Sequence, residues 1–153
     1  MQKSKIILKL FSKISAAVIL LLSSVSISLG TVKANDTTPK ELTQVISNVE
    51  LLDASDTKQN VDSEGDYNLR TGTAYKLRVP FDLKKYNENL NNGDYFTFDI
   101  PEPMTVYSDT KPLVDPNTNI EIGTAVVTSN GINKGGKVTV TLKNLDKFQL
   151  YII

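Results

Sequence analysis

Residues 91–102 read NNGDYFTFDIPE and carry the clearest structural pattern of this 153-residue chain. The stretch opens with a turn signal, because Gly93 reaches positive φ without a Cβ clash and the Asn and Asp beside it bond local backbone. From Tyr95 to Ile100 apolar and polar residues alternate, which is the period of a strand with one buried face. The apolar positions are Phe96, Phe98 and Ile100. This row needs a second layer to cover it, so the stretch predicts a β-sandwich.

Four other segments are predicted as strands, and no stretch has the period of a helix of three turns. These segments are Val45–Leu52, Thr73–Lys84, Ile120–Thr128 and Lys137–Lys143. Loops rich in Gly, Pro and Asn join them, including residues 108–119, while residues 53–69 are predicted as a long loop or a short hairpin. Because Pro80 lacks an N–H, its strand is expected at a sheet edge or at a bulge. The pattern is typical of an all-β, antiparallel sandwich.

The first 34 residues are predicted to be a signal peptide. Four lysines precede an uncharged apolar core at residues 14–22, and residues 32–34 have the pattern of a cleavage site. We expect cleavage between Ala34 and Asn35. The alternative is a membrane anchor, but the apolar run is shorter than the roughly 18–20 residues that a span needs.

The rest of the chain fits one domain. Residues 35–42 are polar and contain a proline, so we predict a flexible lead-in there. Residues 43–153 are predicted to form the sandwich. Without the five lysines of the leader, 12 basic and 17 acidic residues remain, a formal charge of −5. This charge argues against nucleic acid or an anionic membrane surface as partner.

The composition also excludes several kinds of catalysis. The chain has no His and no Cys, which excludes imidazole bases, Ser-His triads, cysteine nucleophiles and Cys/His zinc sites. Asp94 and Asp99 stand at odd separation and face opposite sides of their strand, so they do not form a carboxylate pair. We expect no enzyme activity and no cofactor.

An acidic loop raises a calcium hypothesis, because calcium takes six to eight oxygen ligands and carboxylates supply them. Its members are Asp53, Asp56, Asp62, Glu64 and Asp66. Their spacing does not match a helix–loop–helix calcium site. We favour the alternative, a solvated surface loop without a metal.

The organising stretch also resembles a known family. Gly93–Glu102 is similar to the "GD" strand of the collagen- or fibrinogen-binding adhesins on Gram-positive cell walls, in which alternating apolar residues lead to Pro-Glu. Ile120–Val127 and Gly136–Leu142 match later pieces of that pattern, in order and spacing, over residues 43–148. The resemblance implies an immunoglobulin-like adhesive subdomain at the cell surface.

The resemblance further implies a binding surface. In these adhesins the ligand lies in a groove between two subdomains and along a sheet face, and exposed tyrosines are favourable contact residues. The candidate ligand-binding residues are Tyr95, Thr97, Asp99 and Tyr107. The alternative is that these tyrosines only cover loops.

The expected function is therefore non-catalytic adhesion to a host matrix or plasma protein of the collagen or fibrinogen class, by a secreted or cell-wall protein. A structural spacer without a ligand site is one alternative. A carbohydrate-binding module is another, although the chain has no Trp to stack on sugars. Because the family continues into a second subdomain and a wall-sorting signal, the apolar finish at residues 148–153 is interpreted as the incomplete or truncated end of a longer adhesin.

Overall fold

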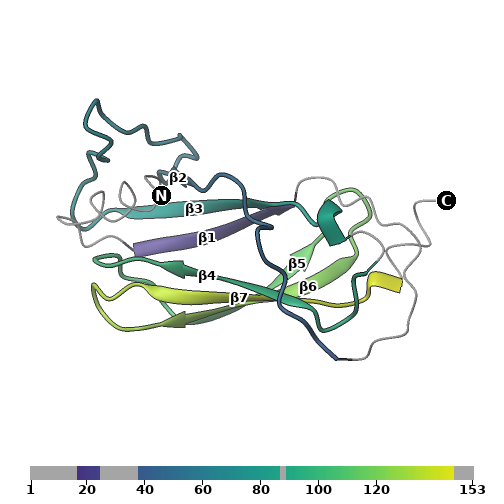
Figure 1. The fold of residues 1–153 in the computed structure, drawn as a ribbon. Coiled ribbons are helices and arrows are strands. Elements are labelled where there is room, and N and C mark those ends of the chain that lie inside the picture. Colours follow the sequence, from purple (N-terminus) through teal and green to yellow (C-terminus); the bar gives the residue numbers. More distant parts are fainter. Residues whose placement is uncertain (1–16, 25–37, 87–88, 147–153) are drawn as a thin grey trace.

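The computed structural model describes residues 17–24, 38–86 and 89–146, and of residues 17–24 only the backbone. The described chain forms two sheets that lie face to face (Figure 1). The helical residues of this part of the chain are one short 3-10 turn, η1 (Lys84–Tyr86), and residues 145 and 146 after β7. The prediction of an all-β, immunoglobulin-like sandwich is therefore confirmed.

The larger sheet has four antiparallel strands in the order β4-β7-β6-β5. They are β4 (Tyr95–Ile100), β5 (Asp109–Val114), β6 (Glu121–Ser129) and β7 (Gly136–Leu142). Three of them were predicted. The fourth, β5, lies in a segment predicted as loop, and that prediction was wrong. Pro112 misled it, because an edge strand with one free side tolerates a residue without an N–H.

The smaller sheet has three strands in the order β1-β3-β2. They are β1 (Ala17–Ser24), β2 (Glu50–Leu52) and β3 (Ala74–Phe81). β2 pairs with β3 in antiparallel and β1 pairs with it in parallel. β3 therefore lies in the middle of this sheet and not at the edge that Pro80 suggested. β1 falls within the predicted signal peptide, whose cleavage stays a prediction.

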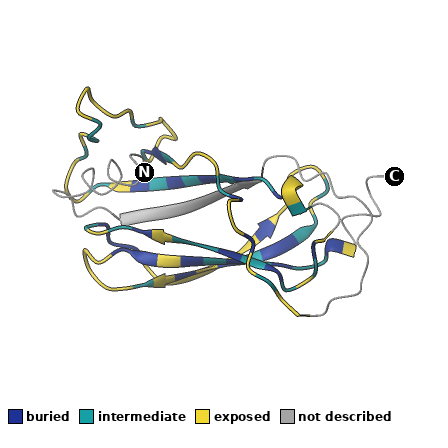
Figure 2. Ribbon diagram, viewed as in Figure 1, coloured by how far each residue is buried: buried dark blue, intermediate teal, exposed yellow. Residues whose placement is uncertain are grey.

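The core lies between the two sheets, and the alternation of the sequence decides which residues enter it (Figure 2). Phe96 and Ile100 of the predicted row are buried, at 1% and 4% exposure, and Phe98 is half-buried against them. β3 buries every second residue from the opposite sheet. Phe81 and Phe96 meet across the core with ring centroids 5.2 Å apart.

A segment before β2 joins the two sheets. Residues 40–42 bond to β4, since the Leu42 N–H donates to the Tyr95 carbonyl at 2.7 Å. A few residues later the Asp82 N–H donates to the Val45 carbonyl, at the end of β3. The predicted lead-in over residues 35–42 thus ends in three residues that are held against the sheet, and Leu42 is buried.

Gly135 offers a test of the packing around β4 and β7. Its φ is +65°, and a Cβ there would overlap the carbonyl oxygen of Ile100. We expect Gly135→Ala to lower the free energy of unfolding by at least about 3 kcal/mol, the sum of left-handed strain and a backbone clash. Urea unfolding followed by circular dichroism measures it.

Gly72→Ala is the matched control. Gly72 also has positive φ, +76°, but a Cβ there would meet no atom within 4 Å. Only the strain of about 1–2 kcal/mol should appear. Equal losses in the two variants would contradict the close approach at Gly135.

Candidate functional site

The outer face of the four-stranded sheet carries mostly threonines, and we call it the threonine face. Its side chains stand at the alternate positions of β4 to β7 that do not enter the core. Its members are Tyr95, Thr97, Asp99, Thr110, Pro112, Thr124, Val126, Thr128, Lys137, Thr139 and Thr141. All of them are half-buried or exposed. The face therefore offers hydroxyl groups in a regular array.

Strand register arranges this face in rows across the strands. The middle row is Thr97, Thr139, Val126 and Thr110. The row on one side of it is Tyr95, Thr141, Thr124 and Pro112. The row on the other side contains Asp99, Lys137 and Thr128. The aromatic residue thus lies on one side of the middle row and the pair of opposite charges lies on the other. The middle row itself is rich in hydroxyl groups and exposes a valine.

The structure brings three of the four predicted binding residues together and separates the fourth. Tyr95, Thr97 and Asp99 share the threonine face, as their spacing predicted. Tyr107 is 71% exposed but lies at the far end of β4. Thr105, two residues before it, pairs with Gly135. The next residue, Gly136, begins β7 and pairs with Ile100, the last residue of β4. Tyr107 and Tyr95 are therefore about 17 Å apart along the strand direction.

The residues that sequence reasoning missed on this face come from β5 and β6. Alternation within β7 already pointed Thr139 and Thr141 outward. Nothing in the sequence, however, indicated that Thr110 would lie beside Val126, because that contact depends on the register between β6 and β5, and β5 was not predicted. Val126 is 41% exposed and is the apolar centre of the face.

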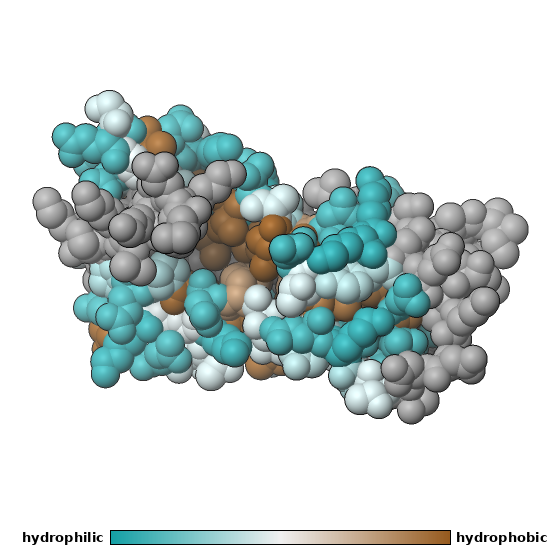
Figure 3. Space-filling view, in the orientation of Figure 1, coloured by the Kyte–Doolittle hydropathy of each residue, from teal (hydrophilic) through white to brown (hydrophobic). Residues whose placement is uncertain are grey.

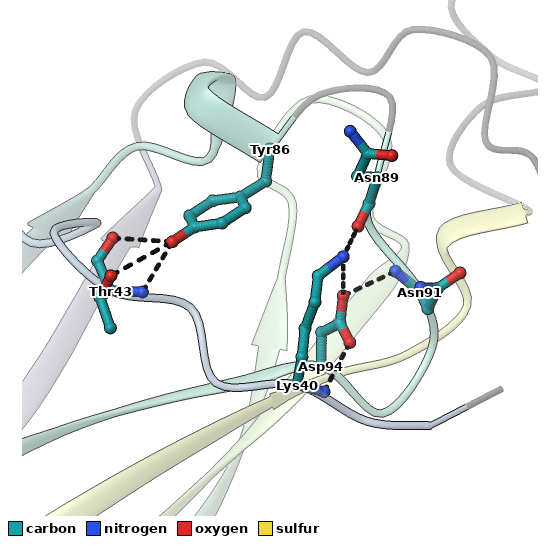
Figure 4. Close-up of polar contacts among 6 residues, drawn as sticks. All are labelled: Lys40, Thr43, Tyr86, Asn89, Asn91 and Asp94. Atoms are coloured by element: carbon teal, nitrogen blue, oxygen red, sulfur yellow. Dashed lines mark hydrogen bonds and ion pairs between the residues drawn. The ribbon is translucent and has the colours of Figure 1, made fainter. Parts of the chain in front are cut away.

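A buried carboxylate fixes the start of β4 (Figure 4). Asp94 is fully buried, and it accepts the Lys40 N–H at 3.0 Å and the Asn91 N–H at 2.9 Å. The Lys40 ammonium lies 3.7 Å from the same carboxylate and donates to the Asn89 carbonyl. Asp94 thus ties residues before β2 to the turn before β4, and its role is structural.

Tyr86 makes a second tie to the same segment (Figure 4). Its hydroxyl accepts the Thr43 N–H at 2.9 Å and donates to the Thr43 carbonyl at 3.1 Å. The hydrogen bonds with Thr43 lower the pKa of Tyr86. The same segment reaches the threonine face, where the Thr97 hydroxyl donates to the Glu41 carboxylate at 3.4 Å.

The calcium candidates do not converge. One carboxylate oxygen of Asp53 accepts hydrogen bonds from two N–H groups of its own loop, and one of Asp62 does the same. Asp56 forms an ion pair with Lys76 at 2.8 Å. Within the described ranges no three acidic side chains gather as a metal ion would require. The remaining candidates are Glu64 and Asp66, on the second of these turns.

An ion-pair cluster lies on the outer face of the smaller sheet. Glu50 contacts Lys58 at 2.8 Å and Arg78 at 3.4 Å. The hydrogen bond and charge of Lys58, together with Arg78, hold the pKa of Glu50 below its ordinary value. Hydrogen bonding to Glu50 likewise raises the pKa of Lys58. These groups lie at the surface and are at least partly exposed, so the cluster contributes little to stability.

The arrangement defines an immunoglobulin-like domain with an exposed sheet face. Comparison with family models then identifies it, because the model of the bacterial Ig domain matches residues 68–144. The chain belongs to the bacterial Ig domain family. Such domains are typically non-catalytic and typical of extracellular surface proteins. The match covers β3 to β7. Comparisons with curated proteins and with solved structures find no match.

The described part of the chain contains no helix long and apolar enough to cross a membrane.

Replacing Asp94 tests its structural role. In Asp94→Ala two buried N–H groups lose their acceptor, so we expect the free energy of unfolding to fall by about 2–4 kcal/mol. Urea unfolding checks the value. Asp99→Ala, at an exposed position of β4, is the control and should change stability by less than about 0.5 kcal/mol. Similar losses in both variants would refute the anchoring role of Asp94.

Glu50 generates a pH-dependent prediction. A carboxyl group with a depressed pKa adds stability above its unfolded pKa, and this stability is lost as the pH falls through the folded pKa. Wild type and Glu50→Gln should therefore show a small difference in urea midpoint at neutral pH, which disappears as the pH falls below the ordinary value of 4.5. A difference that stayed constant from pH 7 to pH 3 would exclude this linkage.

Proposed function

We propose that the chain is the adhesive domain of a Gram-positive surface protein and that its threonine face contacts an extended host protein of the collagen or fibrinogen class. The observation that carries the proposal is the face itself, a regular array with Tyr95 at one margin and Val126 at its centre. Hydroxyl groups donate and accept, and tyrosine adds rigid contact area. The sequence resemblance to collagen- and fibrinogen-binding adhesins supports the ligand class.

The size of the face indicates that it is one part of the binding site. Four strands spaced by about 4.8 Å and about 17 Å long cover roughly 250 Å². A stable interface buries about 800 Å² on each partner. The threonine face therefore needs a neighbouring surface, and a groove against a second subdomain is the arrangement that the resemblance implies. Collagen, which is long and narrow, fits such a groove.

A structural spacer remains the second candidate. The face has only one aromatic residue and no arginine, whereas binding hot spots are enriched in Trp, Tyr and Arg. A carbohydrate-binding module is less favoured, because the chain has no Trp. Localisation outside the cell, after cleavage between Ala34 and Asn35, is part of the proposal in either case.

Binding to immobilised proteins tests the proposal. The protein encoded by the complete reading frame is passed over immobilised collagen, fibrinogen and a glycan panel. The dissociation constant is measured by surface plasmon resonance. We expect binding to one of the two proteins. Tyr95→Ala and Val126→Asp should each weaken it about tenfold or more, since each removes a contact at the margin or centre of the face.

Ile132→Ala is the control variant. Ile132 is 77% exposed and lies between β6 and β7, away from the threonine face. It should bind as the wild type does. Unchanged affinity in all three variants would remove the threonine face from the site. Absence of binding to every surface would favour the spacer.

A further inference from the structure

The sequence contains two Asn-Gly pairs, Asn92–Gly93 and Asn130–Gly131. Asparagine is chemically labile, and a following glycine makes it more so, because no Cβ hinders attack of the glycine nitrogen on the asparagine side chain. Both asparagines are exposed, and both glycines have positive φ, +98° at Gly93 and +115° at Gly131. Sequence and exposure therefore do not distinguish the two pairs, whereas their hydrogen bonds do.

The pair Asn92–Gly93 is fixed at both groups that would react. The Gly93 N–H donates to the Leu142 carbonyl at 2.8 Å, and the side-chain oxygen of Asn92 accepts the Leu145 N–H at 3.0 Å. A Cβ at Gly93 would also lie 3.2 Å from the Pro39 side chain, which leaves little room around this residue. Nitrogen and side chain are thus held at the end of β7, and they can meet only when this part of the chain opens.

The pair Asn130–Gly131 lies in the hairpin between β6 and β7 and is held less firmly (Figure 1). The Gly131 N–H donates to the Ser129 hydroxyl at 3.1 Å, and the Asn130 side-chain nitrogen donates to the Lys134 carbonyl at 3.3 Å. Among the described residues, a Cβ at Gly131 would meet only the Lys134 side chain, 3.7 Å away. The surface at this end of the larger sheet is mostly hydrophilic (Figure 3). Water can therefore replace both side-chain hydrogen bonds, and the reacting groups have room to move.

We propose that Asn130 is a site of spontaneous deamidation in the folded protein and that Asn92 is protected from it. The Gly131 nitrogen attacks the side-chain carbonyl carbon of Asn130 and forms a bond to it. The bond from that carbon to Nδ2 breaks, and Nδ2 leaves as ammonia with the proton that the Gly131 nitrogen gives up. Water then opens the cyclic succinimide at one of its two carbonyls, which leaves aspartate or isoaspartate in place of Asn130. No atom is oxidised or reduced.

The product changes the charge and the hydrogen bonding of the hairpin. An amide nitrogen donates, whereas a carboxylate only accepts. The modified side chain therefore loses its hydrogen bond to the Lys134 carbonyl, and each modified molecule carries one more negative charge. Because Asn130 is not a member of the threonine face, the proposal does not depend on the ligand proposed above.

Peptide mapping of the full, folded chain measures the two rates. The protein is incubated in mildly alkaline buffer and then digested, and cleavage after Glu121 places the two asparagines on separate peptides. Mass spectrometry locates the acid that replaces each amide. We expect Asn130 to convert about tenfold or more faster than Asn92, since reaction at Asn92 first requires two hydrogen bonds to break. Equal rates, or faster conversion at Asn92, would overturn the proposal.

The same chain unfolded in urea is the control. Without structure both asparagines have only their glycine neighbour to decide the rate, so they should convert at similar rates. Folding should then slow Asn92 strongly and Asn130 little. If folding slows Asn130 by about tenfold or more, the hairpin protects it as well, and the proposal is wrong.

Asp94→Ala tests the cause of the protection at Asn92. The Asp94 carboxylate accepts the Asn91 N–H at 2.9 Å and so holds the turn that contains Asn92. Its removal should raise the rate at Asn92 about tenfold and leave the rate at Asn130, at the other end of β7, unchanged. Asp99→Ala is the matched control and should change neither rate. An unchanged rate at Asn92 in Asp94→Ala would refute the assigned protection, while the wild-type comparison needs no variant and holds even if Asp94→Ala fails to fold.

Discussion

The contact between Phe81 and Phe96 is the interaction on which the rest of the sandwich depends. The rings come from strands of different sheets and meet at 5.2 Å between centroids. Burying two phenylalanines contributes about 3–6 kcal/mol before entropy is counted. It also fixes which side of each strand faces inward, because a slip by one residue would send every apolar side chain of that strand outward. The orientation of β3 and β4 therefore determines the character of both outer surfaces.

This constraint explains why the threonine face is polar and regular. Once Phe96 and its neighbours occupy the core, the alternate residues of β4 and β7 have no apolar partner and point to solvent. β-branched threonine suits such positions, since it favours extended backbone and offers a hydroxyl. The buried carboxylate of Asp94 acts at the margin, where it holds the segment that brings Glu41 to Thr97. Fold and candidate site thus share the same few residues.

Alternation made the inner rows of β3, β4 and β7 predictable from the sequence, and with them Tyr95, Thr97 and Asp99 on one outer face. β5 was missed because two prolines in its surroundings resemble loop chemistry, and only pairing with β6 makes it a strand. Residues 40–42 were missed because three residues have no period to detect. Residues 17–24 satisfy the apolar pattern of a signal core, and the same pattern suits a strand, so only the partner strand reveals the pairing.

The loop between β2 and β3 contains two aspartate turns of the same kind. Asp53 and Asp62 begin turns with the same hydrogen bonds, and each turn is closed by its own bridge, Leu52 with Lys58 and Val61 with Tyr67. In each turn the aspartate accepts two backbone N–H groups of its own loop. The two turns are therefore held independently of each other, each by its own aspartate.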